Sequence, residues 1–190
     1  FEQPERKKII NRYKGKEWID RLQNRVIRDL AVAMIKCTEN EADKMIKKYD
    51  GFVSKFLSGG FMALFPNSEI DAVRAALEIN DCTRKFNQLE ICKGNKLTSW
   101  MGIHYGRMII GTIGEENRLD DTVISDTVNT AARIESVCER LNKNIVVSQI
   151  LQKKIALENT VQVEVTELEP LYVKGKEKPL QLYEICRRTK

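Results

Sequence analysis

The spacing of apolar residues along this 190-residue chain changes repeatedly between the helical and the strand period. Apolar positions three and four residues apart predict a helix, whereas short apolar or alternating runs predict strands. Helices are expected at residues 5–26, 39–49, 68–89, 126–141 and 148–156, and strands at residues 30–35, 52–57, 61–65, 98–105, 108–113, 145–147, 161–166 and 180–185. This mixed order predicts an α+β or α/β sandwich with helices packed on one sheet.

Glycine-containing turns punctuate the pattern. Asp50-Gly51 is a strong turn signal after the helix at 39–49, and Ser58-Gly59-Gly60 predicts a hairpin between two strands. Gly106-Arg107 predicts a second hairpin that joins residues 98–105 to residues 108–113, and a polar loop is expected at residues 114–121. Asn67 or Ser68 is expected to cap the long helix that follows.

The charge distribution divides the chain more clearly than its composition does. Residues 1–28 hold nine basic and four acidic residues, and the rest of the chain is balanced. We therefore expect a basic helical connector at residues 1–28, with a solvated face, and one globular domain at residues 29–190. A neutral domain body lacks the positive surface that nucleic-acid binding needs, so no nucleic-acid partner is expected.

Composition excludes several other classes of protein. With 42% hydrophobic and 31% charged residues the chain is not of a disordered type, and no apolar run is long enough to span a bilayer. Five cysteines without CxxC spacing and one histidine, His104, make a zinc site improbable and indicate a reducing, cytoplasmic location. Because the chain begins with Phe1, we expect it to belong to a longer protein.

The stretch at residues 126–133, DTVNTAAR, holds the most informative polar residues. On a helix, Asn129 and Arg133 are four positions apart and therefore share a face. An amide beside a guanidinium suits an oxyanion or a phosphate. The alternative is an ordinary polar surface in which Arg133 pairs with Glu135 or Glu139.

Several ordered blocks around this stretch favour the first interpretation. WMGIHYG at residues 100–106, IGTIG at 110–114 and DTVISDTVNTAARIES at 121–136 follow one another in the order that the class III adenylyl/guanylyl cyclase catalytic domain shows. KFLSGGFMALF at residues 55–65 and the segment at 171–185 resemble two further blocks of that family. The resemblance covers about residues 30–186, which is far more specific than one short motif.

The resemblance implies a fold and an activity. It implies a ferredoxin-like, palm-type βαββαβ core with a mainly antiparallel sheet, helices packed on it and an extra C-terminal hairpin. It implies head-to-tail pairing with a second cyclase domain, as a homodimer or heterodimer, downstream of a sensor domain. The implied reaction is attack of the ribose 3′-hydroxyl of ATP on the α-phosphate, which yields cyclic AMP and pyrophosphate with Mg²⁺ or Mn²⁺ held by two aspartates.

Five residues match the family's nucleotide contacts in this sequence. By resemblance, Lys55 and Thr122 read the base, Asn129 orients the ribose, Arg133 stabilises charge at the α-phosphate and Lys174 binds the terminal phosphates. The pair formed by Lys55 and Thr122 is of the adenylyl type, because guanylyl cyclases have a different pair.

The two metal aspartates of the family have no match. Gly59 stands where the family's GDG turn has its carboxylate. The first aspartate ends the family's first strand in a pattern like FxDIxGF, and here that strand, residues 30–35, is followed by Lys36, which lies at or beside the aspartate's place. An ammonium repels a divalent cation and glycine offers only backbone atoms.

Three explanations for these substitutions stay open at this point. The chain is a half-site partner that needs a domain with the aspartates, or a pseudo-cyclase that binds nucleotide or only dimerises, or it lacks a segment near residues 35–38. Other carboxylates do not replace the missing pair: Asp126 is expected to cap a helix, and Asp120 and Asp121 to lie in the polar loop.

A different class, the RNA-recognition module, shares the ferredoxin-like core. Such a module needs aromatic residues on the sheet and a basic surround. The neutral domain body argues against it.

Overall fold

The computed structural model describes residues 6–14, 40–57, 60–89, 96–115, 118–124, 126–158, 160–172 and 179–188. The described strands are β1 (Arg6–Lys14), β2 (Phe52–Leu57), β3 (Gly60–Phe65), β4 (Thr98–Gly106), β5 (Ile109–Glu115), β6 (Arg118–Ile124), β7 (Ile145–Ser148), β8 (Val163–Leu171) and β9 (Leu180–Arg187). The described helices are α3 (Glu69–Phe86), α4 (Asp126–Leu141), α5 (Gln149–Glu158) and a helix at residues 40–48. None of the helices among these residues is long and apolar enough to cross a bilayer.

Seven strands form one twisted sheet in the order β2-β3-β1-β4-β7-β9-β8. The first four pair antiparallel, with β1 between β3 and β4. Together with the helix at residues 40–48 and α3, they make the ferredoxin-like βαββαβ core that the resemblance implies. β7 is parallel to β4. The antiparallel pair of β8 and β9 extends the sheet beyond β7 and is the expected C-terminal hairpin.

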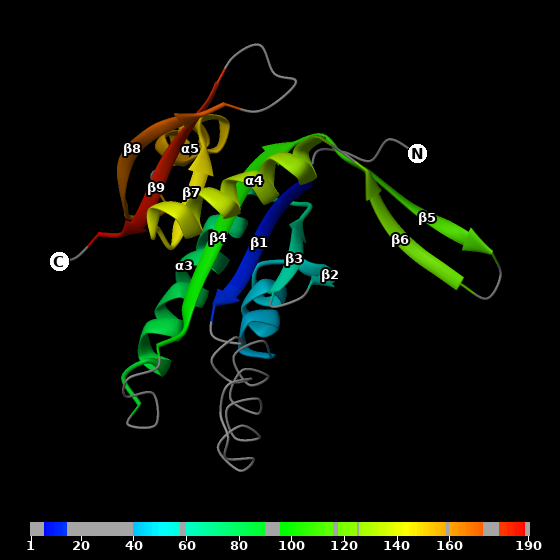
Figure 1. Cartoon of the computed structure of the whole chain (residues 1–190), viewed down its shortest axis with the longest axis horizontal. Helices are drawn as coiled ribbons and strands as arrows, with labels where there is room; N and C mark the ends of the chain where they lie inside the picture. The colour runs from blue at the N-terminus through cyan, green and yellow to red at the C-terminus, as the bar shows by residue number, and fades with distance from the viewer. Residues whose placement is uncertain are drawn as a thin grey trace.

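Helices cover both faces of the sheet. Alternate strand residues point to opposite faces, so Met101 and Ile103 join the core beneath α3, α5 and residues 40–48, while Trp100 and Val146 join a smaller core beneath α4. Figure 1 shows α4 crossing the sheet over β4. The site residues on α4 therefore lie on the face opposite the main core.

The ends of α3 follow the sequence signals. The Ser68 hydroxyl accepts a hydrogen bond from the Ile70 amide, which confirms Ser68 as the cap. At the other end, the Asn87 side chain accepts from the Leu97 amide at 2.9 Å and donates to its carbonyl at 2.7 Å. The helix is thereby joined to the start of β4.

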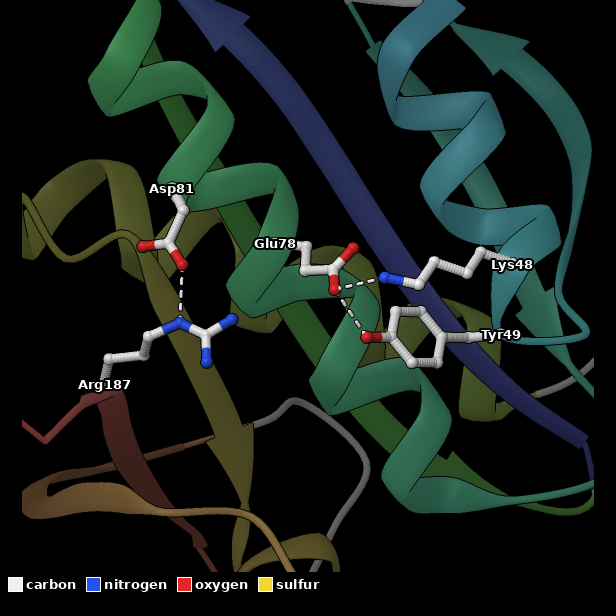
Figure 2. Close-up of polar contacts among 5 residues, drawn as sticks. All are labelled: Lys48, Tyr49, Glu78, Asp81 and Arg187. Atoms are coloured by element: carbon white, nitrogen blue, oxygen red, sulfur yellow. Dashed lines mark hydrogen bonds and ion pairs between the residues drawn. The ribbon is translucent and has the colours of Figure 1, made fainter.

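Charged contacts tie α3 to its neighbours. Figure 2 shows one Glu78 oxygen accepting from Lys48 Nζ at 2.7 Å and from the Tyr49 hydroxyl at 2.6 Å. Asp81, one turn further along, accepts from Arg187 Nε on β9. Consequently α3 is fixed on one side to the helix at 40–48 and on the other to the C-terminal strand.

The helix predicted at residues 5–26 is wrong for its first part, because Arg6–Lys14 is strand β1. Ile9, Ile10 and Tyr13 fit a helical stripe, but pairing with strands on both sides outweighs this local preference. The described part of the predicted connector, β1, is thus a strand of the main sheet, and residues 15–28 lie outside the described residues. Residues 30–35, which were expected to form a strand, lie outside the described residues. The first strand of the sheet in chain order is β1.

The predicted hairpin at Gly106-Arg107 is also wrong. β4 pairs with β1 on one edge and with β7 on the other, so neither edge is left for β5. β5 instead pairs with β6 in a separate two-stranded sheet, which we call the β5–β6 extension. Figure 1 shows this extension reaching away from the main sheet. The predicted polar loop at 114–121 is accordingly strand from Arg118 onward, and Asp120 and Asp121 lie in β6.

Candidate functional site

Asn129 and Arg133 lie together on the exposed face of α4. The opposite face is buried against β4 and β7 through the side chains of Thr127, Thr130, Ala131, Ile134, Glu135, Val137 and Cys138. Since the two exposed side chains are one helical turn apart, both are available to one ligand. This arrangement confirms the shared face that their spacing predicts.

The alternative, a polar surface closed by an ion pair, finds no support in the described residues. Glu135 is only 2% exposed and belongs to the buried face, away from Arg133. Glu139 lies six positions after Arg133, which places the two residues on different faces of α4. Arg133 is exposed, and its guanidinium is accessible to an external anion.

Gly102 sets how closely α4 approaches the sheet. A Cβ built on Gly102 would lie 2.3 Å from the Glu135 amide nitrogen and 2.6 Å from the Ala131 carbonyl oxygen. These are backbone atoms, so only a residue without a side chain lets the helix lie this close to β4. Gly102 thus limits how far α4, with Asn129 and Arg133, lies above the sheet.

Lys55 lies exposed on β2, the edge strand of the seven-stranded sheet. It pairs with Met62, and the register shifts between Val53 and Lys55. Such a bulge bends and twists the strand locally. Phe56, the next residue along the strand, is 66% exposed.

Thr122 is on β6, opposite Gly111 in the β5–β6 extension. The two residues predicted to read the base, Lys55 and Thr122, therefore belong to different sheets. The structure places Asn129 and Arg133 on one helix face and the base-reading pair on two separate sheets. Lys174 lies outside the described residues.

The residues present do not fit a two-metal site. β1 holds the first-strand place between β3 and β4, so the first carboxylate belongs at the end of β1 and not near Lys36, which lies outside the described residues. The sequence of β1, RKKIINRYK, contains no aspartate or glutamate. Within the described residues no group of three or more histidine, cysteine or acidic side chains is placed to hold a metal ion.

A glycine that follows β1 in the sequence shows where the first metal-binding aspartate of the family pattern would fall. With the FxDIxGF pattern placed on residues 10–16, its glycine falls on Gly15 and its aspartate on Arg12. An arginine thus stands in sequence where the aspartate is expected, and Gly59, outside the described residues, stands at the other position. With β1 as the first strand, 25 residues separate it from the helix at 40–48, so the expected missing segment is no longer needed.

Two other reactive groups near α4 are structural. Burial, and then the nearby Glu135, raises the pKa of the Cys138 thiol to about 12, and its Sγ donates to the Ile134 and Met101 carbonyls. His104 is buried on β4, with Nδ1 2.8 Å from the Ser148 hydroxyl. A thiol held protonated is a poor nucleophile, and the buried histidine is held within the fold by its contact with Ser148.

Comparison with known proteins agrees with this arrangement. The family described as the adenylate and guanylate cyclase catalytic domain matches residues 26–186. The chain belongs to this family. The matched residues make up most of the chain. β1 precedes them in the sequence, although it is an interior strand of the sheet.

Sequence relatives of this cyclase domain include named adenylate cyclases. It is 30% identical over 148 residues to the adenylate cyclase of Anabaena cylindrica, which covers 75% of this chain and 29% of that protein. It is 31% identical over 140 residues to the terminal-differentiation specific adenylate cyclase of Dictyostelium discoideum, which covers 71% of this chain and 6% of that protein. The chain therefore spans less than a third of these relatives.

Solved cyclase structures share the fold. The adenylyl cyclase CyaB from P. aeruginosa superposes with a TM-score of 0.81 at 20% identity, with 100% of this chain and 98% of that chain covered. At this identity the likeness concerns the fold, and it agrees with the ferredoxin-like core described above.

Proposed function

We propose that this cyclase domain supplies the nucleotide-binding half of a composite adenylyl cyclase site. The observation that carries the proposal is the pair of exposed side chains, Asn129 and Arg133, which share one face of α4. The class III resemblance and the adenylate cyclases among the sequence relatives support ATP as the nucleotide.

The proposed reaction forms cyclic AMP. The 3′-hydroxyl oxygen of ATP bonds to the α-phosphorus, the bond from that phosphorus to the bridging oxygen breaks, and pyrophosphate leaves. The hydroxyl proton passes to water. Asn129 holds the ribose so that the hydroxyl faces the phosphorus, and Arg133 stabilises the negative charge that develops on the α-phosphate oxygens.

Base selection is assigned to Lys55 and Thr122, and the terminal phosphates to Lys174. Because Lys55 and Thr122 stand on different sheets, the base-reading pair forms only if the β5–β6 extension and the edge of the main sheet meet around the nucleotide. A threonine hydroxyl both donates and accepts hydrogen bonds, so the adenine preference rests on the family pattern.

The metal carboxylates are assigned to a partner domain. β1 and Gly59 provide none, so a homodimer would lack both at both of its sites. We therefore favour head-to-tail pairing with a cyclase domain that bears the two aspartates, and the β5–β6 extension is the element we assign to the contact. An upstream sensor domain and a cytoplasmic location stay predictions.

A second candidate function is a regulatory module that binds nucleotide or pairs with a cyclase but takes no part in turnover. The absence of acidic residues from β1 favours it. The two candidates differ in one result: only the half-site partner raises cyclic AMP production when it is mixed with an aspartate-bearing domain.

The nucleotide-binding claim is tested by titration calorimetry of the purified chain with ATP and with GTP. We expect ATP to bind more tightly, and Arg133→Ala to weaken its binding about ten-fold or more, the scale of a lost hydrogen bond to a charged group. Arg140→Ala, which removes another exposed arginine from the same helix, is the matched control and should bind ATP like the unaltered chain. Equal ATP affinity in both variants would sink the assignment.

A further inference from the structure

The first turn of α4 is held against the point where the chain leaves the main sheet. Thr127 is only 6% exposed, and its hydroxyl donates to the carbonyl of Arg107 at 2.7 Å. A Cβ on Gly106 would lie 2.5 Å from that hydroxyl oxygen. The glycine thus makes room for the threonine, whose hydroxyl forms a partly buried hydrogen bond across the contact.

This contact sits at the base of the β5–β6 extension. β4 ends at Gly106 and β5 begins at Ile109, so two residues, Arg107 and Met108, join the seven-stranded sheet to the two-stranded one. Met108 is buried as well. Both linking residues are therefore anchored in the domain, one by its carbonyl and the other by its side chain.

The junction contacts the helix directly through Thr127. α4 packs on β4 with backbone atoms close to Gly102, which leaves no room for the helix to bend toward the sheet. Closely packed elements shift as bodies and do not deform continuously. A displacement of the extension would therefore reach Thr127 through the Arg107 carbonyl, and Asn129 lies two residues further along the same helix.

We propose that Thr127 is a positioning residue that couples the β5–β6 extension to Asn129 and Arg133. Resting on the proposed function, the inference adds how that site is regulated: the position of the extension sets the position of the ribose- and phosphate-binding side chains. Such coupling is reciprocal. A contact that fixes the position of the extension therefore strengthens nucleotide binding to α4, and nucleotide binding strengthens that contact.

The test compares Thr127→Val, which keeps the shape but removes the hydroxyl, with Thr127→Ser, which keeps the hydroxyl. Hydrogen exchange followed by mass spectrometry reports the coupling without any nucleotide. We expect Thr127→Val to raise exchange about five-fold both at residues 107–110 and in the first turns of α4, and Thr127→Ser to restore it. Ser136→Ala, which removes a hydroxyl bonded only within α4, is the control and should change neither segment.

ATP affinity tests the link to the site. Thr127→Val is expected to weaken ATP binding about three- to ten-fold, and to add little in an Arg133→Ala background, because its effect acts through that face of the helix. Full additivity, or Thr127→Val exchanging like the unaltered chain, would overturn the inference. If the unaltered chain binds no ATP, the proposed function fails and the role at the site fails with it, whereas the exchange result still decides whether the extension and α4 are coupled.

Discussion

Glu78 illustrates at the residue scale what sequence alone does and does not show. The apolar stripe places Tyr49 on the inner face of its helix, as the structure confirms. The hydrogen bond from its hydroxyl to Glu78 joins residues 29 positions apart, and no local pattern records it. Asn129 and Arg133 differ in this respect, because their shared face follows directly from helical spacing.

The Glu78 contacts predict a pH-dependent loss of stability. Partial burial raises the pKa of the Glu78 carboxyl, but the hydrogen bonds from Lys48 and Tyr49 outweigh it and hold the pKa below its ordinary value of 4.5. A lowered carboxyl pKa stabilises the fold above that ordinary value, and the stabilisation is lost as the pH falls through the folded pKa. Tyr49→Phe should therefore lower the free energy of unfolding by about 1 kcal/mol at pH 7, and by progressively less below pH 4.5.

Urea unfolding at a series of pH values checks this prediction. Tyr172→Phe is the matched control, because the Tyr172 side chain is 81% exposed and its hydroxyl has no such partner among the described residues. A Tyr49→Phe effect that stays constant with pH would show that Glu78 is not the group that the hydroxyl stabilises.

At the scale of elements, the errors of sequence interpretation share one cause. β1 has a helical stripe, and residues 98–113 have a hairpin signal, yet pairing with neighbouring strands on both sides of β1 and of β4 decides both outcomes. Elements whose signals are local, such as the capped helix α3 and the hairpin strands β2 and β3, are predicted to within three residues at each end. Pairing on both sides of β1 is a property of the assembled fold, and the pattern of apolar residues in β1 does not reveal it.

The contact between α4 and β4 predicts a strongly destabilising small substitution. Gly102→Ala puts a methyl group against the backbone of Ala131 and Glu135, so α4 must shift, and we expect a cost of about 1–3 kcal/mol. Thermal unfolding measures it, with Ser136→Ala on the exposed side of α4 as the control. An unchanged melting temperature for Gly102→Ala would mean that the helix lies further from the sheet than described.

At the scale of the whole molecule, β1 makes the basic N-terminal segment part of the domain. It pairs over its length with β4 and over most of it with β3. Its removal would leave two buried strands without partners in the middle of the sheet, and buried backbone groups without hydrogen bonds are costly.

Deletion of residues 1–14 is therefore expected to abolish cooperative unfolding. Deletion of residues 1–5, which leaves β1 intact, is expected to preserve it. Circular dichroism during thermal unfolding distinguishes the two. A chain of residues 15–190 that folds cooperatively would show that β1 is dispensable and would restore the boundary at residue 28.

The central claim is that this chain binds the nucleotide but lacks the metal carboxylates. The most direct measurement is cyclic AMP production from ATP and Mn²⁺ by the purified chain, beside an Arg12→Asp/Gly59→Asp variant that restores both carboxylates. The account predicts no turnover by the unaltered chain, and turnover by the variant that is lost on adding Asn129→Ala. Turnover by the unaltered chain that Asn129→Ala abolishes would contradict the claim, because the metal ligands would then come from residues of this chain that the account does not assign.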